Sequence, residues 1–276
     1  MDMWLLVLEG LAIGCLLGLT GAGGGILAVT ALMASQGWTV SQAAPVGLLA
    51  ISLSAFVGSV QGLLKKIVRY KAAIWIALIS IPSARYGVHL SNIISPTWLS
   101  LAFSLVMMVV AYRIFFNKVH DFEDPPCKVN QSTGKLIWNV KTASVLGLIG
   151  VVAGLLTGLL GVGGGFVIVP ALRKATDLDM RSIVATSLMI IFLIGGVSIS
   201  IHVLDGFQYP VSVTISFVVA CILGMLVGRR LINLIDLKTV QKIFATVVIG
   251  VAVYLIWTSL SVLFLYKVSY LKNEIL

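Results

Sequence analysis

Two glycine-rich stretches have the residue types and spacing best suited to chemistry. "GLTGAGGG" occupies residues 18–25 and "GLLGVGGG" occupies residues 158–165, each between strongly apolar runs. Consecutive glycines destabilise a helix by about 1 kcal/mol each relative to Ala, so we expect a helix to break at each stretch. Helices restarting near Ile26 and Phe166 would direct their positive N-terminal ends into the breaks, which favours coordination of an anion. The alternative is that these glycines only form a tight turn between packed helical arms.

The glycines expected to bind substrate through their backbone are Gly21, Gly23, Gly24 and Gly25 in the first stretch, and Gly161, Gly163, Gly164 and Gly165 in the second. Neither stretch is followed by Lys and Ser or Thr, and neither has the spacing of a dinucleotide fingerprint. Nucleotide binding is therefore not indicated. We expect no cofactor and no bound metal, because the three histidines lie in no HExxH motif.

The composition places these stretches in a membrane. Of 276 residues, 59% are hydrophobic and only 11% are charged, whereas a soluble domain of this length has about 25% charged residues. Continuous apolar runs of about 20 residues are each long enough to cross a hydrocarbon core of about 30 Å as a helix. The net charge of +9 is attributed to basic residues flanking membrane helices, so we expect the lipid bilayer and no nucleic acid as a partner.

The chain contains an internal duplication. Aligning Gly10 with Gly150 superimposes 10–32 on 150–172 without a gap, and 12 of 23 positions are identical. In each copy three glycines spaced four apart (Gly10, Gly14 and Gly18; Gly150, Gly154 and Gly158) lie on one helix face, where we expect them to permit close helix packing. A polar stretch between the copies is the only substantial hydrophilic segment, and we interpret it as a linker.

The distribution of basic residues decides how the glycine-broken segments lie. If each segment crosses the membrane once, the 19 Lys and Arg residues divide 11 to 8 between the two sides. If each segment turns back as a re-entrant hairpin, 16 of the 19 share one side, and only Arg85, Lys267 and Lys272 do not. The second arrangement follows the positive-inside rule. Each half then has an odd number of crossings, so the second half is inverted relative to the first, as in secondary transporters.

The expected fold class is thus an all-α polytopic membrane protein made of two inverted repeats. Each repeat has one glycine-broken hairpin and three transmembrane helices. The first repeat (1–116) has a hairpin at 3–34 and spans at 42–63, 72–92 and 96–113; a cytoplasmic linker covers 117–138; the second repeat (139–276) has a hairpin at 142–172 and spans at 182–204, 209–228 and 239–265. Both termini are expected outside the cytoplasm.

The two glycine signatures, with "GLLTGLLGVGGGFVIVPAL" (154–172) and "VATSL" (184–188) in the second half, resemble the TauE/SafE family of membrane permeases. The first half departs from the pattern, because "PVGLL" (45–49) replaces the Thr-Ser pair. The resemblance covers nearly the whole chain. It implies transport of small sulfur-containing or organic anions, such as sulfite, thiosulfate, sulfonates or sulfoacetate, across a bacterial cytoplasmic membrane.

Polar residues inside the spans are further candidates for contact with substrate. Thr186 and Ser187 have hydroxyls that could donate to an oxyanion, or cap and back-bond their own helix instead. Gln61 and His202 lie near the ends of equivalent spans, as ligands or as interfacial residues. Arg85 would attract anions, or snorkel to the interface.

Glu9 is the one acid inside a membrane segment. It would carry a coupling proton, pair with Arg85, or sit among the lipid headgroups.

The expected function is therefore a secondary anion transporter that works by alternating access, with proton coupling as an option. A passive anion channel is the alternative. A membrane-embedded enzyme is a more remote one, because the chain lacks a constellation of nucleophile or metal ligands. The substrate's identity, the direction of transport and the oligomeric state do not follow from the sequence.

Overall fold

The computed structural model describes residues 3–21, 24–116, 126–128, 136–208, 210–231, 245–246 and 248–257. Within these ranges the protein is helical, as expected. The helices are α1 (Met3–Thr20), α2 (Gly24–Gln36), α3 (Val40–Leu64), α4 (Tyr70–Ile93), α5 (Pro96–Phe116), α6 (Val140–Leu160), α7 (Gly165–Ala175), α8 (Met180–Leu204) and α9 (Val211–Leu231). A further short apolar helix covers Val248–Trp257.

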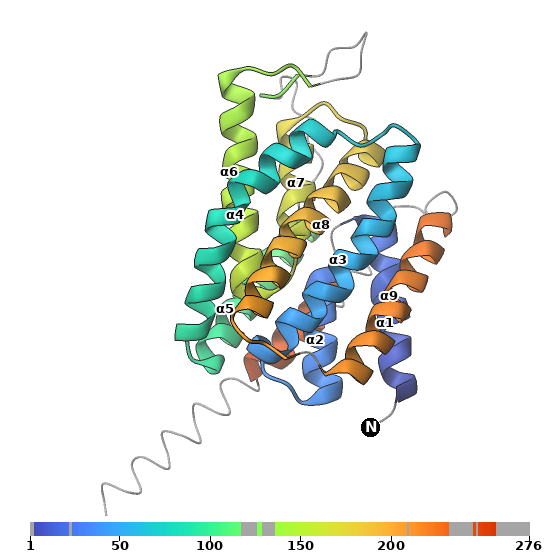
Figure 1. Cartoon of the computed structure of the whole chain (residues 1–276), viewed down its shortest axis with the longest axis vertical. Coiled ribbons are helices and arrows are strands. Elements are labelled where there is room, and N and C mark those ends of the chain that lie inside the picture. The colour runs from blue at the N-terminus through green and yellow to red at the C-terminus, as the bar shows by residue number, and fades with distance from the viewer. Residues whose placement is uncertain are drawn as a thin grey trace, which may run out of the picture.

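Both glycine-rich stretches interrupt a helix and reverse the chain. Figure 1 shows α1 rising from the end of the molecule where the chain starts, here called the lower end, and α2 returning toward it. In the second half α6 descends from the opposite, upper end and α7 returns upward. The arms are unequal, since α1 has 18 residues and α2 has 13, while α6 has 21 and α7 has 11.

The observed helices match most of the expected spans to within a few residues. Among the described residues, six helices are long and apolar enough to cross a membrane: α1, α3, α4, α6, α8 and α9. The longer arm of each hairpin is thus itself of spanning length, while the shorter arm is not. The last expected span, 239–265, lies outside the described residues except at 245–246 and 248–257, which are helical.

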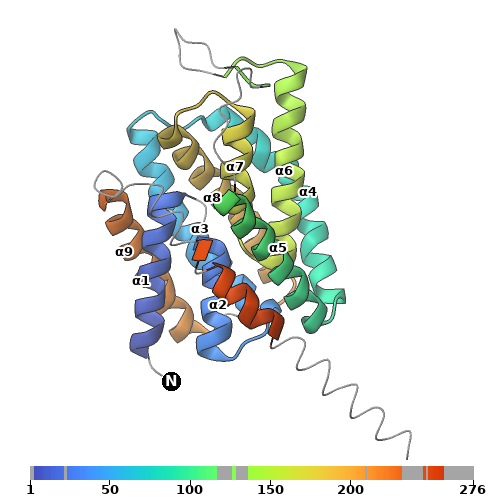
Figure 2. The same ribbon diagram turned by 180° about the vertical axis from the view of Figure 1, so that it is seen from behind.

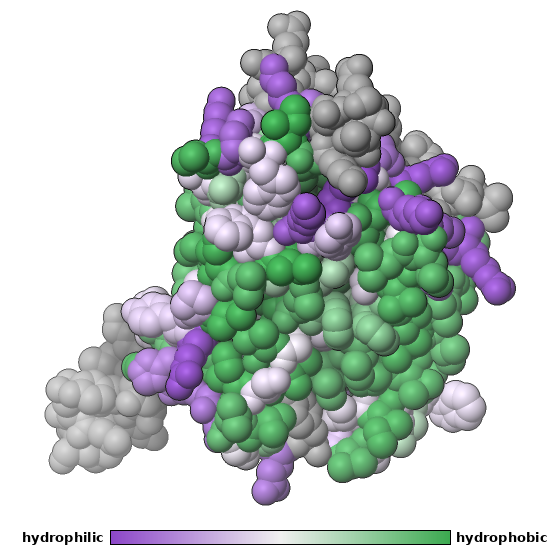
Figure 3. All heavy atoms as spheres, turned by 45° about the horizontal axis from the view of Figure 1, so that its top comes forward, coloured by the Kyte–Doolittle hydropathy of each residue, from purple (hydrophilic) through white to green (hydrophobic). Residues whose placement is uncertain are grey.

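The junctions between helices lie at the two ends as the hairpin arrangement requires. The α4–α5 and α8–α9 junctions lie at the lower end, and the α3–α4 and α7–α8 junctions lie at the upper end (Figure 1). Figure 3 shows hydrophilic side chains gathered toward the upper end, above a broad hydrophobic surface. The exposed lysines there include Lys65, Lys66 and Lys71. Which end faces the cytoplasm, and the division into two inverted repeats, stay predictions.

The spaced glycines pack helices from different halves against one another. A Cβ at Gly14 would meet backbone atoms of Cys221 on α9, and a Cβ at Gly158 would meet backbone atoms of Ala84 on α4. Facing glycines contribute as well, because Gly228 abuts Cys15 and Gly87 abuts Leu155. The expected packing role of these glycines is confirmed: α1 lies along α9, and α6 lies along α4 (Figure 2).

Local geometry also repeats at positions that the gap-free alignment of the two copies makes equivalent. Lys66 (φ 56°) ends the turn after α3, and its equivalent, Gly206 (φ 83°), ends the turn after α8. Their backbone N–H groups donate to the carbonyls of Leu63 and Val203, which are equivalent to each other as well. A non-glycine residue rarely adopts this left-handed conformation. Lys66 therefore keeps the geometry of the turn although the sequences "KKI" and "DGF" share nothing.

Candidate functional site

The glycine tips are the two short segments that join the arms, residues 21–23 and 161–164. Gly21 (φ 68°) and Gly161 (φ 67°) both adopt the left-handed conformation that ends a helix. Their N–H groups donate to the carbonyls of Leu17 and Thr157 at 2.8 and 2.9 Å. Gly163 (φ 70°) and Gly164 (φ 63°) are also left-handed, so turn geometry alone favours glycine at these positions. Gly23 lies outside the described residues.

The start of α2 touches the second tip. A Cβ at Gly25, in the first turn of α2, would collide with the backbone carbonyl of Val162 in the second tip. The N-terminus of α2 is thus held directly against the turn that precedes α7. The first backbone N–H groups of both helices, including those of Gly24, Gly25 and Gly165, have no intrahelical acceptor by the geometry of a helix. Two partial positive charges, each about half an elementary charge, converge here.

Apolar side chains fill the space beside the tips. The Ile51 side chain lies next to both, with Cδ1 2.9 Å from the position of a Cβ at Gly24 and Cγ2 3.8 Å from one at Gly163. Ile191, the equivalent of Ile51 in the second copy, also borders Gly163. Ile51 and Ile191 are buried. An anion would reach the free N–H groups only after the tips separate or Ile51 moves.

Thr186 and Ser187 are fully buried at the start of α8 and form hydrogen bonds within the protein. The Ser187 hydroxyl lies 2.9 Å from the Gly21 carbonyl oxygen and 2.8 Å from that of Val184, and it donates toward them. The Thr186 hydroxyl accepts the Arg69 backbone N–H at 3.0 Å. Ser187 therefore holds the first tip in place, and Thr186 positions the turn before α4. Substrate contact by either hydroxyl stays a prediction.

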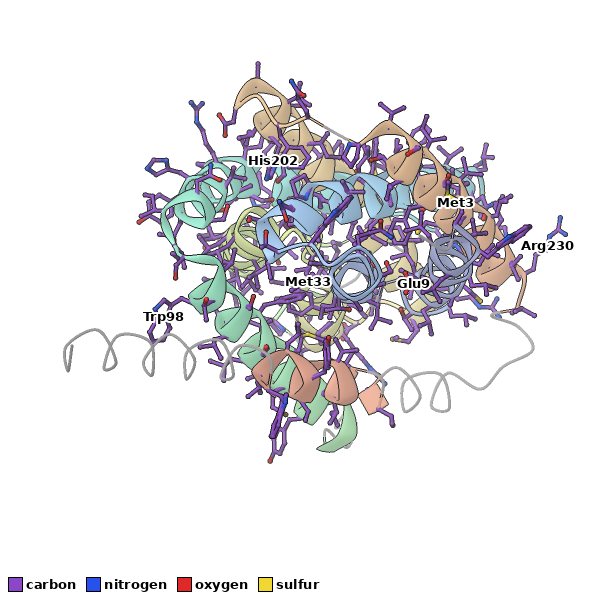
Figure 4. The ribbon with its side chains drawn as sticks, turned by 90° about the horizontal axis from the view of Figure 1, so that it is seen from below. Met3, Glu9, Met33, Trp98, His202 and Arg230 are labelled. Carbon is purple, nitrogen blue, oxygen red and sulfur yellow. The ribbon has the colours of Figure 1, made fainter. Side chains whose placement is uncertain are left out.

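A cavity of about 180 Å³ lies at the lower end. It is bounded by the start of α3, the ends of α4, α6 and α8, and the turn after α8. Its lining residues are Ser41, Ala44, Ser91, Asn92, Gly158, Leu159, His202, Asp205, Gly206 and Phe207. The cavity ends close to the second tip, since Ala44 also contacts Gly161. Of the expected polar candidates, His202 is the one that lines it (Figure 4).

The remaining candidates lie apart from one another. Arg85 is exposed on α4 and does not line the cavity. Gln61 is half-buried at the upper end of α3, where its backbone carbonyl accepts the Lys65 N–H. Glu9 lies between α1 and α2 (Figure 4), and its carboxylate is hydrogen-bonded to Ser35. Glu9 does not pair with Arg85 among the described residues, which answers one of the three options for it.

Two buried cationic groups were not expected from the sequence. Arg229 on α9 and Arg69 before α4 each have a buried Nε without a hydrogen-bond partner in the described part of the chain. In the sequence, Arg229 and Arg69 serve only as basic residues that indicate membrane topology. The adjacent Gly228, which aligns with Gly87 when one residue is inserted in the second copy, lets α9 approach α1 and is the sequence signal that could have placed Arg229 inside the bundle. Among the residues that the structure describes, no group of three or more His, Cys, Asp or Glu side chains gathers to hold a metal.

Cys127, in the segment before α6, is a buried packing residue rather than a reactive thiol. Cys127 is fully buried, and its backbone N–H donates to the Ala175 carbonyl at the end of α7. Burial raises the pKa of the Cys127 thiol above its usual value, so the thiol stays neutral and packs. Cys15, Cys127 and Cys221 are all free thiols.

Comparison with known proteins decides the family. The family model described as "Sulfite exporter TauE/SafE" matches residues 6–255. The chain belongs to the TauE/SafE family. The match includes both hairpins with their glycine tips.

Two curated relatives are similar to this TauE/SafE protein along almost their whole length. A "Probable membrane transporter protein" of Xylella fastidiosa (strain Temecula1) is 29% identical over 251 residues, covering 90% of this chain and 92% of the relative. "Probable membrane transporter protein YunE" of Bacillus subtilis (strain 168) is 27% identical over 279 residues, covering 93% and 98%. No solved structure matches the chain. With six candidate spans, the chain is a multi-pass membrane protein, and membrane transport is the function class that its relatives support.

Proposed function

We propose that this protein is a secondary transporter that moves a small sulfur-containing or organic anion across the bacterial cytoplasmic membrane by alternating access. Candidate substrates are sulfite, thiosulfate, sulfonates and sulfoacetate. The observation that carries the proposal is the contact between Gly25 and Val162. It brings the N-terminus of α2 against the second tip, so that free backbone N–H groups face a buried, apolar region where an anion would compensate them.

Access to this region supports a carrier rather than an open pore. The lower-end cavity stops at Gly158 and Leu159, and the packed tips with Ile51 lie beyond it. An anion entering from the lower end would pass the second tip only if the helices rearranged. Rearrangement of one half against the other around a central site is how transporters with inverted repeats expose that site alternately. In this proposal the lower end is the outer face, and both chain termini are expected on that side of the membrane.

A flux assay separates the carrier from the alternative, a passive anion channel. Purified protein is reconstituted into liposomes, and uptake of labelled sulfite or thiosulfate is measured with and without an imposed proton gradient. A coupled carrier accumulates the anion above its outside concentration, whereas a channel only equilibrates it. Accumulation of a cation with all tested anions inert would contradict the proposal as a whole. We propose no enzymatic activity.

The topology has its own test. Single cysteines are introduced into a background lacking Cys15, Cys127 and Cys221, and intact cells are treated with a thiol reagent that does not cross the membrane. Positions in the junctions 92–96 and 204–209 should react from outside, and positions in 64–71 and 117–138 should not. Outside labelling of the 117–138 linker would overturn the inverted-repeat arrangement.

A further inference from the structure

Arg229 and Arg230 are adjacent basic residues at the upper end of α9 with opposite environments. Arg230 is exposed and extends away from the bundle (Figure 4). Arg229 is half-buried and reaches α3, where its Nη2 donates to the carbonyl oxygen of Gly58 at 2.9 Å. A residue that only marked topology would project outward as Arg230 does.

The Arg229 guanidinium is incompletely compensated. Its Nε is buried and has no hydrogen-bond partner in the described part of the chain, and no ion pair to Arg229 occurs there. The one contact made by its charge is the neutral Gly58 carbonyl. A half-buried cation without a counter-charge is costly, and such a group inside a membrane protein points to a ligand or an ion pathway.

The backbone of Arg229 packs against the last turn of α1, the arm that leads to the first glycine tip. Its backbone nitrogen lies 3.0 Å from the position of a Cβ at Gly18, one helical turn before Gly21. With the one-residue insertion that aligns Gly87 with Gly228, the corresponding residue in the other half is Val88, whose backbone nitrogen lies 2.9 Å from a Cβ position at Gly158. The two halves thus use equivalent backbone contacts, but only the upper end has a cation at this place.

We propose that Arg229 binds the transported anion at the upper end of the bundle, where its side chain lies between α9 and α3. This rests on the proposed function and adds a recognition residue for it. The guanidinium offers several N–H donors in one plane, so Nε–H and a terminal N–H group can hold a sulfur oxyanion or a carboxylate while Gly58 fixes the side chain. Arg69, whose Nε is also buried and unpaired at this end, adds to the positive potential.

The test compares Arg229→Met with the matched control Arg230→Met. Thiosulfate or sulfite uptake is measured in right-side-out and inside-out vesicles, so that KM is obtained at each face. Losing a charged hydrogen bond to the anion costs about tenfold or more in affinity. We expect Arg229→Met to raise KM about tenfold at the upper-end face, with less than a twofold change at the lower-end face. Arg230→Met should match the wild type at both faces.

Thermal unfolding distinguishes a binding role from a structural one. Removing an uncompensated buried charge should leave the unfolding temperature of Arg229→Met equal to that of the wild type or higher, while the stabilisation by added thiosulfate falls. If Arg229→Met does not fold, Arg229→Lys carries the test, and an unchanged upper-face KM in that variant would overturn the inference. Wild-type KM values at both faces in Arg229→Met would overturn it too. A wild-type protein that neither transports nor is stabilised by any anion would overturn the proposed function first.

Discussion

The two hairpins share a backbone but not a charge pattern. Gly21 and Gly161 end the long arms with nearly identical φ angles, 68° and 67°. At the lower end of the first hairpin, however, Glu9 is hydrogen-bonded to Ser35. The corresponding residues of the second hairpin are Ile149 and Ala175. The duplicated feature is therefore the helix break, and the feature found once is an ionisable group.

This difference indicates a division of tasks. An anion site built from backbone N–H groups needs both tips, because each supplies only about half a positive charge. A coupling site needs one titratable group and gains nothing from a second copy. Within the part of the chain that the structure describes, Glu9 Oε2 is buried without a hydrogen-bond partner, as is Gln36 Oε1 one residue beyond Ser35. We therefore expect changes at the tips to stop transport and changes at Glu9 to alter its driving force.

The largest effect is expected at equivalent tip positions that differ in conformation. Gly24→Leu and Gly164→Leu should both abolish anion uptake, because a side chain at Gly164 would collide with Ala153 and Thr157 on α6 and one at Gly24 with Ile51 and Leu17, so that either variant displaces the glycine-rich junction. Only Gly164 is left-handed (φ 63°), so Gly164→Leu should lose about 1–2 kcal/mol of additional stability. Gly24→Leu meets mainly the side chains of Ile51 and Leu17. Thermal unfolding of the two variants measures this difference in stability. Normal uptake by either variant would show that the tips are only turns and do not bind the anion.

A smaller change tests the contact between the start of α2 and the second tip. Gly25→Ala adds one methyl group against the Val162 carbonyl. Overpacking of this kind costs about 1–3 kcal/mol, and uptake should fall about tenfold or more because the tips are forced apart. Gly196→Ala on α8 is the matched control, since a Cβ there meets nothing within 4 Å. Equal uptake by the two variants would show that the tips need not touch.

The sequence predicted the helix breaks and the small-residue packing because both depend on local chemistry. A run of glycines weakens a helix wherever it occurs, and the internal duplication assigned the same break to both halves. The charge asymmetry then chose the hairpin arrangement over a single crossing. Helix boundaries therefore differ from expectation by only a few residues, as at α3 (Val40–Leu64 against 42–63).

The parts that the sequence did not predict depend on contacts between distant segments. The Gly25–Val162 contact joins two different halves of the chain and has no local pattern. Likewise, nothing near Ser187 indicates that its hydroxyl meets Gly21. The sequence alone does not distinguish Arg229 from Arg230. Only the direction of each side chain on α9 separates the half-buried guanidinium from the exposed one.

The asymmetry at Glu9 predicts a change in coupling rather than in binding. Glu9→Gln removes the titratable proton but keeps the size and a hydrogen bond to Ser35. Uptake driven by a proton gradient should fall to the level seen without one, while thiosulfate stabilises the purified variant as it does the wild type. Ile149→Gln is the control at the equivalent position of the second hairpin. Proton-driven accumulation by Glu9→Gln equal to that of the wild type would remove Glu9 from the coupling path.

The smallest effect is expected at Arg85, which is exposed on α4 and lies outside the cavity lining. It can act on an anion only through its field, so Arg85→Gln should weaken apparent affinity from the lower-end face by about two- to threefold at low salt. The Debye length falls from about 30 Å at 0.01 M to about 8 Å at 0.15 M salt, so the loss should shrink over that range. Arg85→Lys keeps the charge and should resemble the wild type. A loss that persists at high salt would instead indicate direct contact with the anion, and no loss at any salt would leave Arg85 as a snorkelling residue.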